Sequence, residues 1–310
     1  MDPTPTPGTV TAADDTTLRL WELVPEGADE AVCFLHGSIT CSRALFAPPV
    51  ENDDSYSWLH AAARDGRAAF ALDVRGYGDS ERPPEMAEDP AANPATPRAD
   101  LAAEDVRAAF DHVRDRFETV HLVGVSWGTM TAGRFLADHE HDAASLAQVA
   151  PVYLPPWSFD EVAAALNVDG NLGAYYDQRY DAVAERQGGD DALFEAIWTT
   201  QVESGQGESA DRYLVPAGAL ADTREACSGT AAYDARVLDL PTLVVRGSQD
   251  AISVRDDAVG LYDRLRLPHE EKEYLELGGA DHYAMHGARR QELYDAVAAF
   301  QDRYSKSESA

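Results

Sequence analysis

Short apolar runs, each closed by glycine or polar residues, recur in the first half of the chain and again near its end. Runs of this length suit strands that are buried on both faces of a parallel sheet. Amphipathic helical patterns follow several of them, and strands that alternate with helices indicate an α/β fold. We therefore predict a mostly parallel, doubly wound sheet with helices on both faces. The predicted strands span residues 17–24, 31–35, 68–73, 121–125, 146–150, 242–246 and 273–277.

Helical periodicity is clearest in the residues that follow Pro97. Apolar side chains recur there at spacings of three and four residues, which places them on one face of a helix. Thr96 and Pro97 fit the N-cap and the first position of that helix. The other predicted helices span residues 57–64, 129–138, 256–266 and 291–304.

Residues 152–235 interrupt the alternation, because they hold short helical patterns and no convincing strand. This segment carries 10 of the 27 aromatic residues of the chain. It predicts a helical lid whose rings either line an apolar pocket or form the core of the lid itself. The predicted domains are a core in two parts, residues 16–151 and 236–304, with the lid at 152–235 and flexible tails at 1–15 and 305–310.

The large excess of acidic over basic residues limits the classes of molecule that the protein can bind. The chain has 55 acidic and 25 basic residues, a net charge of −30, and its lysines are Lys272 and Lys306 alone. Such a surface repels the phosphates of nucleic acids and anionic membrane surfaces, so we expect neither as a partner. An acid-rich, lysine-poor chain resembles the proteins of extreme halophiles, in which salt screens the self-repulsion. A very soluble acidic protein is the alternative interpretation.

Three cysteines, Cys33, Cys41 and Cys227, occur without a Cys-x-x-Cys or Cys/His cluster, which is typical of a reducing compartment. Cys41 either borders a pocket or is a small buried apolar residue, and the second role is the commoner one. Residues 1–15 lack the basic and apolar regions of a signal peptide. No apolar run approaches the roughly 18 residues that a membrane span needs. We therefore expect a cytoplasmic protein.

The strongest local motif is Gly124-Val125-Ser126-Trp127-Gly128, between a predicted strand and a predicted helix. A G-x-S-x-G sequence at such a junction forces a sharp turn, and the glycines let the chain pass close to itself. The serine is left on a strained elbow with its hydroxyl exposed. Ser126 is therefore the candidate nucleophile.

A serine hydroxyl needs a base to take its proton, and the base needs an acid to orient it. Asp250 lies in the turn after the strand predicted at 242–246, at the edge of the sheet where ligands bind. His282 follows the strand predicted at 273–277, so one helix and one strand return it to the same edge. Asp250 and His282 are therefore the candidate acid and base.

Other titratable residues near these positions have plainer interpretations. Asp281 adjoins His282 and has a structural role, because neighbouring side chains point in different directions. Asp256 and Asp257 fall in the following helix, where we expect them to face solvent. His282 and His286 have the i, i+4 spacing of metal ligands on a helix, but no third ligand is evident.

Together these features resemble the α/β-hydrolase superfamily, over nearly all of residues 16–304. Ser126, Asp250 and His282 match its nucleophile, acid and base in their order along the chain. The resemblance implies a hydrolase that needs no cofactor and no metal. Residues 73–80 resemble the D-x-R-G-x-G-x-S turn of the family, and the predicted lid at 152–235 stands where the family places its lid. A group of little-characterised bacterial hydrolases is further resembled by residues 56–59, 82–86 and 126–129.

The resemblance also implies the groups that bind the oxyanion. His36-Gly37 follows an early strand and resembles the oxyanion loop of the family. The donors would then be the backbone N–H groups of Ser38 and Trp127.

Two differences from particular subfamilies of the α/β hydrolases limit the subfamily to which this chain can be assigned. A serine nucleophile disfavours the epoxide hydrolases and haloalkane dehalogenases that use an aspartate. The loop at residues 36–40 reads His-Gly-Ser-Ile-Thr, whereas prolyl aminopeptidases have His-Gly-Gly-Pro-Gly. A Ser-Trp-Gly elbow does occur in that aminopeptidase family, so peptidase activity remains open.

The leading hypothesis is a Ser-His-Asp hydrolase that acts on a small or medium acyl substrate, most simply a carboxylic ester. One alternative is an aminopeptidase or amidase, which would need a lid carboxylate such as Glu161, Glu185 or Glu195 to bind the substrate amine. Another is a ligand-binding protein on the same fold that has no catalytic activity. The sequence determines neither the substrate nor the oligomeric state.

Overall fold

The computed structural model describes residues 4–166, 168, 172–187 and 191–305. Within them, eight strands form one sheet in the order β1-β2-β4-β3-β5-β6-β10-β11. The two pairings that involve β2 are antiparallel and the others are parallel, which confirms the predicted mostly parallel sheet. The strands are β1 (Thr6–Thr11), β2 (Thr17–Leu23), β3 (Glu30–Leu35), β4 (Ala68–Leu72), β5 (Thr119–Val125), β6 (Ser145–Val149), β10 (Thr242–Gly247) and β11 (Lys272–Leu277).

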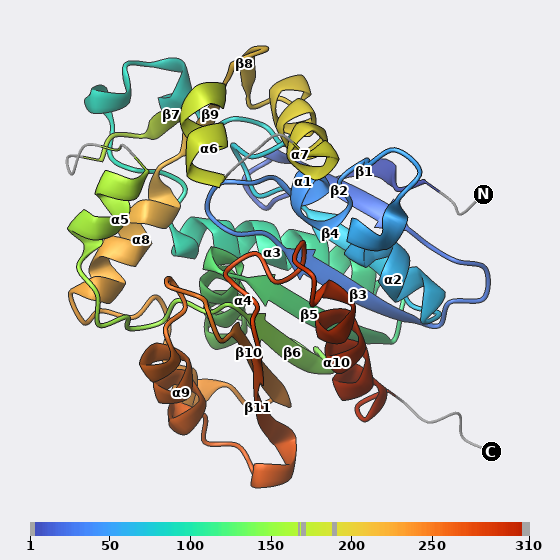
Figure 1. The fold of residues 1–310 in the computed structure, drawn as a ribbon. Helices are drawn as coiled ribbons and strands as arrows, with labels where there is room; N and C mark the ends of the chain where they lie inside the picture. Colours follow the sequence, from blue (N-terminus) through green and yellow to red (C-terminus); the bar gives the residue numbers. More distant parts are fainter. Residues whose placement is uncertain (1–3, 167, 169–171, 188–190, 306–310) are drawn as a thin grey trace.

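Helices cover both faces of this sheet (Figure 1). Side chains alternate between the two faces of a strand, and β3 shows the result. Ala31, Cys33 and Leu35 join the core cluster that includes α3, α4 and α9, whereas Val32 and Phe34 join the cluster that includes α2 and α10. The sheet is therefore doubly wound, as predicted. The helices of this core are α1 (Ser42–Phe46), α2 (Trp58–Arg64), α3 (Ala99–Arg114), α4 (Trp127–Asp138), α9 (Arg255–Arg264) and α10 (Arg290–Asp302).

The prediction of a flexible tail at residues 1–15 is wrong for its described part. Residues 6–11 form β1, which pairs antiparallel with β2, and Val10 and Ala12 are buried. The sequence of this strand has one apolar residue among threonines, a proline and a glycine, so no local pattern predicts it. The strand forms because β2 would otherwise be an edge strand with unpaired backbone groups. At the other end, Ser305 donates a hydrogen bond to Glu30 over 2.7 Å. The tail predicted at 306–310 lies outside the described residues.

The helix predicted to begin at Pro97 begins two residues later. Arg98 is the N-cap of α3 and Ala99 is its first residue. The backbone N–H of Ala99 donates to the Asp222 carboxylate over 2.8 Å. A carboxylate from a distant part of the chain therefore satisfies the helix end in place of the predicted Thr96 cap.

The segment between β6 and β10 is not wholly helical, which corrects the expectation that it holds no strand. Within the described residues it contains a three-stranded antiparallel sheet in the order β7-β9-β8. Its strands are short, and β7 and β8 are rich in polar residues, so neither has an alternating apolar pattern to reveal it. Its elements are α5 (Phe159–Ala165), β7 (Tyr175–Arg179), α6 (Tyr180–Gln187), α7 (Ala192–Glu203), β8 (Gly207–Ser209), β9 (Arg212–Pro216) and α8 (Gly218–Cys227).

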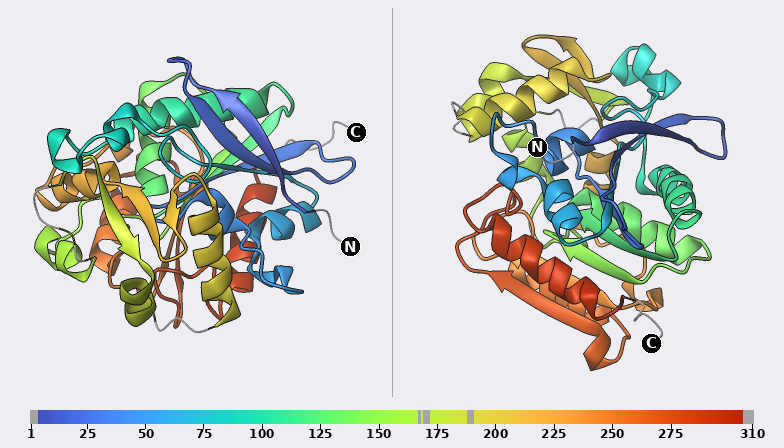
Figure 2. Two further views of the ribbon diagram at one scale, coloured as in Figure 1. Left: turned by 90° about the horizontal axis from the view of Figure 1, so that it is seen from above. Right: turned by 90° about the vertical axis from the view of Figure 1, so that its right-hand side faces the viewer.

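This insertion is gathered on one side of the central sheet (Figures 1 and 2). Tyr180, Phe194, Trp198 and Tyr213 pack against one another with ring centroids 5.2–6.4 Å apart. Four of its ten aromatic residues thus form a core of the insertion itself, one of the two roles that the sequence left open.

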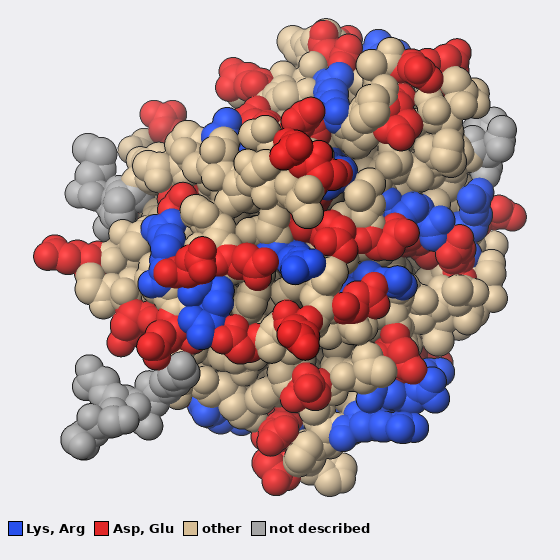
Figure 3. All heavy atoms as spheres, turned by 180° about the vertical axis from the view of Figure 1, so that it is seen from behind, with Lys and Arg blue, Asp and Glu red and all other residues tan. Residues whose placement is uncertain are grey.

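Acidic side chains are spread over the face drawn in Figure 3, with basic side chains among them. Many carboxylates form exposed ion pairs, such as Asp142 with Arg114 over 2.6 Å. Adaptation to high salt stays a prediction. Among the described residues, no helix combines the length and apolar character that a membrane span requires.

Candidate active site

The candidate nucleophile sits on the tight turn between β5 and α4. Ser126 has φ 54° and ψ −117°, a strained conformation for a residue with a side chain. The turn needs glycine on both sides of it. A Cβ on Gly124 would lie 2.5 Å from the Gly128 carbonyl oxygen, and one on Gly128 would lie 2.2 Å from that of Leu35. The G-x-S-x-G spacing therefore follows from close backbone packing.

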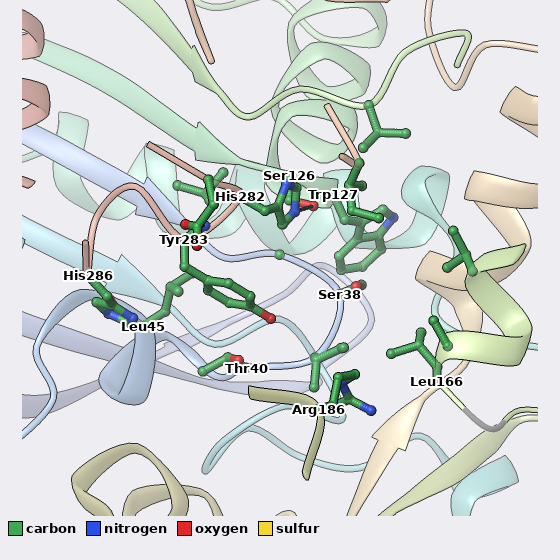
Figure 4. Close-up of a pocket in the computed structure, with 18 of the residues that line it drawn as sticks. Ser38, Thr40, Leu45, Ser126, Trp127, Leu166, Arg186, His282, Tyr283 and His286 are labelled. Atoms are coloured by element: carbon green, nitrogen blue, oxygen red, sulfur yellow. Dashed lines mark hydrogen bonds between the residues drawn. The ribbon is translucent and has the colours of Figure 1, made fainter. Parts of the chain in front are cut away.

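The structure brings Ser126, His282 and Asp250 together (Figure 4 shows the first two). The Ser126 Oγ lies 3.1 Å from His282 Nε2, and His282 Nδ1 lies 2.9 Å from Asp250 Oδ2. The residues follow β5, β11 and β10, whose carboxyl ends meet at one edge of the parallel sheet. This arrangement allows His282 to take a proton from Ser126 while Asp250 holds its ring.

The Asp250 side chain is fully buried beside the imidazole. Burial by itself raises the pKa of Asp250. The charge of His282 and the hydrogen bonds from His282, Ser253 and Ile252 together lower it by more, so the pKa lies below its usual value. The N–H groups of Ile252 and Ser253 each donate to Asp250 Oδ1 over 2.8 Å. Asp250 is therefore fixed as a carboxylate, with its other oxygen toward the histidine.

Arg246, which lies in no recognisable sequence motif, supports the turn that carries Asp250. Its buried guanidinium donates to the backbone oxygens of Ser253, over 2.7 Å, and Asp250, over 3.1 Å, and pairs with Glu276 over 2.5 Å. The residue lies in the buried strand β10. A charged residue within an otherwise apolar strand run was the available signal.

The predicted oxyanion donors belong to the two segments beside the nucleophile, the loop after β3 and the first residue of α4. A Cβ on Gly37 would lie 3.3 Å from Ser126 Cβ, so the loop after β3 passes directly over the nucleophile. Among the described residues, no hydrogen-bond acceptor takes the backbone N–H of Ser38 or Trp127. Both donors remain available to a negatively charged oxygen beside Ser126.

Residues of the insertion hold both donor segments in place. Gln201 of α7 accepts a hydrogen bond from the Cys41 N–H over 2.9 Å and donates to the Ile39 carbonyl over 3.2 Å. Asp222 of α8 accepts the indole N–H of Trp127 over 2.8 Å. The insertion therefore positions the loop after β3, which carries one of the predicted oxyanion donors.

A cavity of about 590 Å³ opens onto Ser126, His282 and the loop at 37–40. The insertion supplies much of its wall, with Arg186 and Asp191 as the charged residues from that segment. Trp157 and Phe194 of the insertion are among the lining residues, so some of its aromatic rings also line the cavity. Apolar lining residues from the insertion are Val152, Trp157, Val162, Ala165, Leu166, Leu193, Phe194, Ile197 and Leu220.

The rival titratable residues have structural contacts. Asp281 accepts the Tyr283 N–H over 3.0 Å, as its structural role predicts. Asp256 is exposed, but the expectation that Asp257 faces solvent is wrong. Asp257 is buried and accepts the N–H groups of Tyr153 and Leu154 over 2.8 and 2.6 Å, because this loop turns inward after β6.

Cys41 is buried and does not line the cavity, which favours its role as a small apolar residue. Among the described residues, no cluster of three potential metal ligands occurs. Glu161, Glu185 and Glu195, the lid carboxylates considered for an amine, are exposed and do not line the cavity.

His286 also lines the cavity, but it is buried and its Nε2 donates to the Leu45 carbonyl over 2.8 Å. Burial lowers the pKa of His286 to about 4. In the unfolded chain its pKa is about 6.5, so the unfolded state binds an extra proton between these values. Stability from the neutral ring is present above pH 6.5 and is lost as the pH falls towards 4.

The variant His286→Gln keeps a side-chain donor near Leu45 but cannot take up the proton. We expect its unfolding free energy to fall by roughly 2 kcal/mol less than that of the wild type between pH 7 and pH 5. Urea unfolding at both pH values measures this, with the exposed His269→Gln as the control. An equal loss in His286→Gln and wild type would contradict the prediction.

Comparisons with known proteins agree with this geometry. The sequence matches the profile of the α/β-hydrolase fold family over residues 30–287. A search of curated proteins gives no significant match. A solved esterase from Exiguobacterium antarcticum is similar in structure, with a TM-score of 0.66, 15% identity, and coverage of 96% of this chain and 100% of its own.

Two further solved structures show the same fold. A serine hydrolase involved in carbazole degradation has a TM-score of 0.63 and 17% identity over 97% of this chain and 100% of its own. An E-2-(acetamidomethylene)succinate hydrolase has a TM-score of 0.65 and 22% identity over 96% of this chain and 99% of its own. Because the profile covers most of the sequence, the chain belongs to the α/β-hydrolase family.

Proposed function

We propose that this protein is a serine hydrolase that cleaves a small or medium acyl substrate, most simply a carboxylic ester. The observation that carries the proposal is the line of hydrogen-bond contacts from Ser126 Oγ through His282 to the Asp250 carboxylate. The esterase among the similar structures supports the ester class.

In the acylation step, Ser126 Oγ attacks the carbonyl carbon and its proton passes to His282 Nε2. Asp250 accepts the Nδ1–H of His282, which selects the right tautomer and stabilises the imidazolium that forms. The carbonyl oxygen becomes negative and binds the backbone N–H groups of Ser38 and Trp127. His282 then returns the proton to the departing alcohol.

In the deacylation step, His282 takes a proton from water, and the resulting hydroxide attacks the acyl-enzyme carbonyl. Collapse of this second intermediate releases the acid and restores the Ser126 hydroxyl. The apolar lining of the cavity favours the hydrocarbon part of an acyl substrate, and its volume of about 590 Å³ suits a small or medium one.

Hydrolysis of p-nitrophenyl acetate, butyrate and octanoate, measured in about molar KCl to screen the surface charge, tests the proposal. We expect turnover of at least one ester, and the preferred chain length then measures the usable depth of the cavity. A folded protein that turns over none of the three would contradict the ester assignment.

Two other outcomes point to the alternative functions. Turnover of a proline arylamide without ester turnover would indicate an aminopeptidase or amidase. Ligand binding that survives Ser126→Ala, without turnover of any acyl substrate, would indicate a binding protein on the hydrolase fold.

A further inference from the structure

One arginine stands at the cavity wall. Arg186, in the last turn of α6, is the single lysine or arginine among the described residues that line the cavity. Figure 4 shows it across the cavity from Ser126 and His282, with Ser38 and Thr40 between them in that view. A molecule held at Ser126 can therefore extend towards the guanidinium.

The charge of Arg186 is not neutralised by the described residues. Acidic residues outnumber basic ones by 55 to 25, and many arginines pair with a carboxylate, yet no described carboxylate lies within ion-pair distance of Arg186. Its Nη2 donates to the Gln178 side chain over 2.9 Å. A guanidinium has five N–H donors, so within the described residues most of them have no partner and can donate to a ligand.

The two carboxylates that line the cavity are engaged elsewhere. Asp191 accepts the Phe194 N–H over 2.7 Å as the N-cap of α7. Asp281 accepts the Tyr283 N–H over 3.0 Å. Both stabilise local backbone turns, and neither forms an ion pair with Arg186 among the described residues.

Two tyrosine side chains, Tyr283 and Tyr176, lie near Arg186, and Tyr283 lines the cavity. The Tyr283 hydroxyl points into the space between Thr40 and Arg186 (Figure 4). The Tyr176 hydroxyl is buried and has no hydrogen-bond partner among the described residues. Burial raises the pKa of both hydroxyls, and the nearby charge of Arg186 lowers it by less, so both remain protonated donors.

We propose that Arg186 binds a carboxylate on the substrate, so that the preferred substrate is an ester that carries a second, anionic end. This inference rests on the proposed hydrolase function and names its substrate class. A guanidinium binds a carboxylate through paired, charge-assisted hydrogen bonds. Because the net charge of −30 repels anions at long range, a local cation is needed to hold one.

The test uses two matched pairs of substrates at one fixed KCl concentration. The first pair, p-nitrophenyl hydrogen glutarate and its neutral glutaramate, places the charge on the acyl side. The second, 4-carboxyphenyl butyrate and 4-carbamoylphenyl butyrate, places it on the alcohol side. Rates in Ser126→Ala measure spontaneous hydrolysis, which is subtracted.

Three variants accompany the wild type. Arg186→Gln removes the charge and Arg186→Lys keeps it without the planar fork. Arg179→Gln removes the same charge from β7, where Arg179 is exposed, pairs with Asp177 and does not line the cavity. It is therefore the matched control for a change in net charge.

For at least one pair, we expect wild-type kcat/KM to favour the carboxylate by about 10- to 100-fold. Arg186→Gln should lose this preference and keep its activity on the neutral ester, Arg186→Lys should keep part of it, and Arg179→Gln should behave as wild type. Equal rates within both pairs, or a preference that persists in Arg186→Gln, would overturn the inference.

Binding separates this inference from the proposed function. Calorimetry on Ser126→Ala measures the affinity for glutarate and for the neutral glutaramide without catalysis. Tighter binding of glutarate that disappears in Ser126→Ala/Arg186→Gln supports the anion site even if no ester is hydrolysed. Equal binding of the two compounds in that case overturns the inference together with the function.

Discussion

The Ser126→Ala variant is expected to lose at least about 1000-fold in kcat on any ester that the wild type hydrolyses. Ser126 Oγ is the atom placed to form the acyl bond, 3.1 Å from His282 Nε2. Without it, the cavity and the oxyanion donors still bind substrate, so KM should change much less than kcat. Steady-state kinetics on the preferred p-nitrophenyl ester measure both constants.

Two further variants control for folding and for loss of a hydroxyl. Ser228→Ala removes an exposed hydroxyl at the end of α8 and should keep wild-type activity. Ser126→Gly should be inactive and about 1 kcal/mol more stable than Ser126→Ala, because glycine adopts the positive φ of this turn at little cost. Wild-type turnover in Ser126→Ala would remove Ser126 from the mechanism.

The second large effect is expected for Asp250→Asn, which should lower kcat by about 1000- to 10,000-fold. An asparagine whose carbonyl takes the place of Oδ1 keeps the hydrogen bonds from Ile252 and Ser253. Its amide NH₂ then faces His282 Nδ1, where the wild type has a carboxylate oxygen 2.9 Å away. The ring is held in the wrong tautomer, and its cation loses its stabilising charge.

Asp257→Asn and Asp281→Asn are the matched controls. Asp257 is also buried and also accepts backbone N–H groups, and Asp281 adjoins the base in sequence. Among the described residues, no hydrogen bond or ion pair joins either carboxylate to His282, so each variant should keep kcat within about tenfold of the wild type. Asp250 would lose its assigned role if its variant were no slower than these two.

The elements of the central sheet could be predicted from sequence because their signal is local. A strand buried on both faces needs a continuous apolar run, and a helix that covers it needs an apolar stripe. The elbow motif is contiguous in sequence, and Gly124 is required by a local contact with the Gly128 carbonyl, although Gly128 itself is required by the distant Leu35 carbonyl. Chain order and strand ends then placed Asp250 and His282 at the same edge as Ser126.

Residues whose partners are distant in sequence could not be predicted in this way. The first strand pairs because β2 has an open edge, and α3 begins where Asp222 reaches the Ala99 N–H. Asp257 is buried because the loop after β6 brings the N–H groups of Tyr153 and Leu154 to it. In each case a contact that forms only on folding outweighs a weak local preference.

The sequence alone thus determined where the central strands, the elbow, the acid and the base lie along the chain. Local patterns sufficed because they encode burial and backbone shape. Only the tertiary structure decided that Arg246 holds the Asp250 turn, that Gln201 holds the oxyanion loop, and that Arg186 lines the cavity. These roles depend on which polar groups meet after folding. Charged and polar residues are frequent along the whole chain, and most of them face solvent. The few with a structural or binding role can be recognised only by their burial and by the distances to their partners.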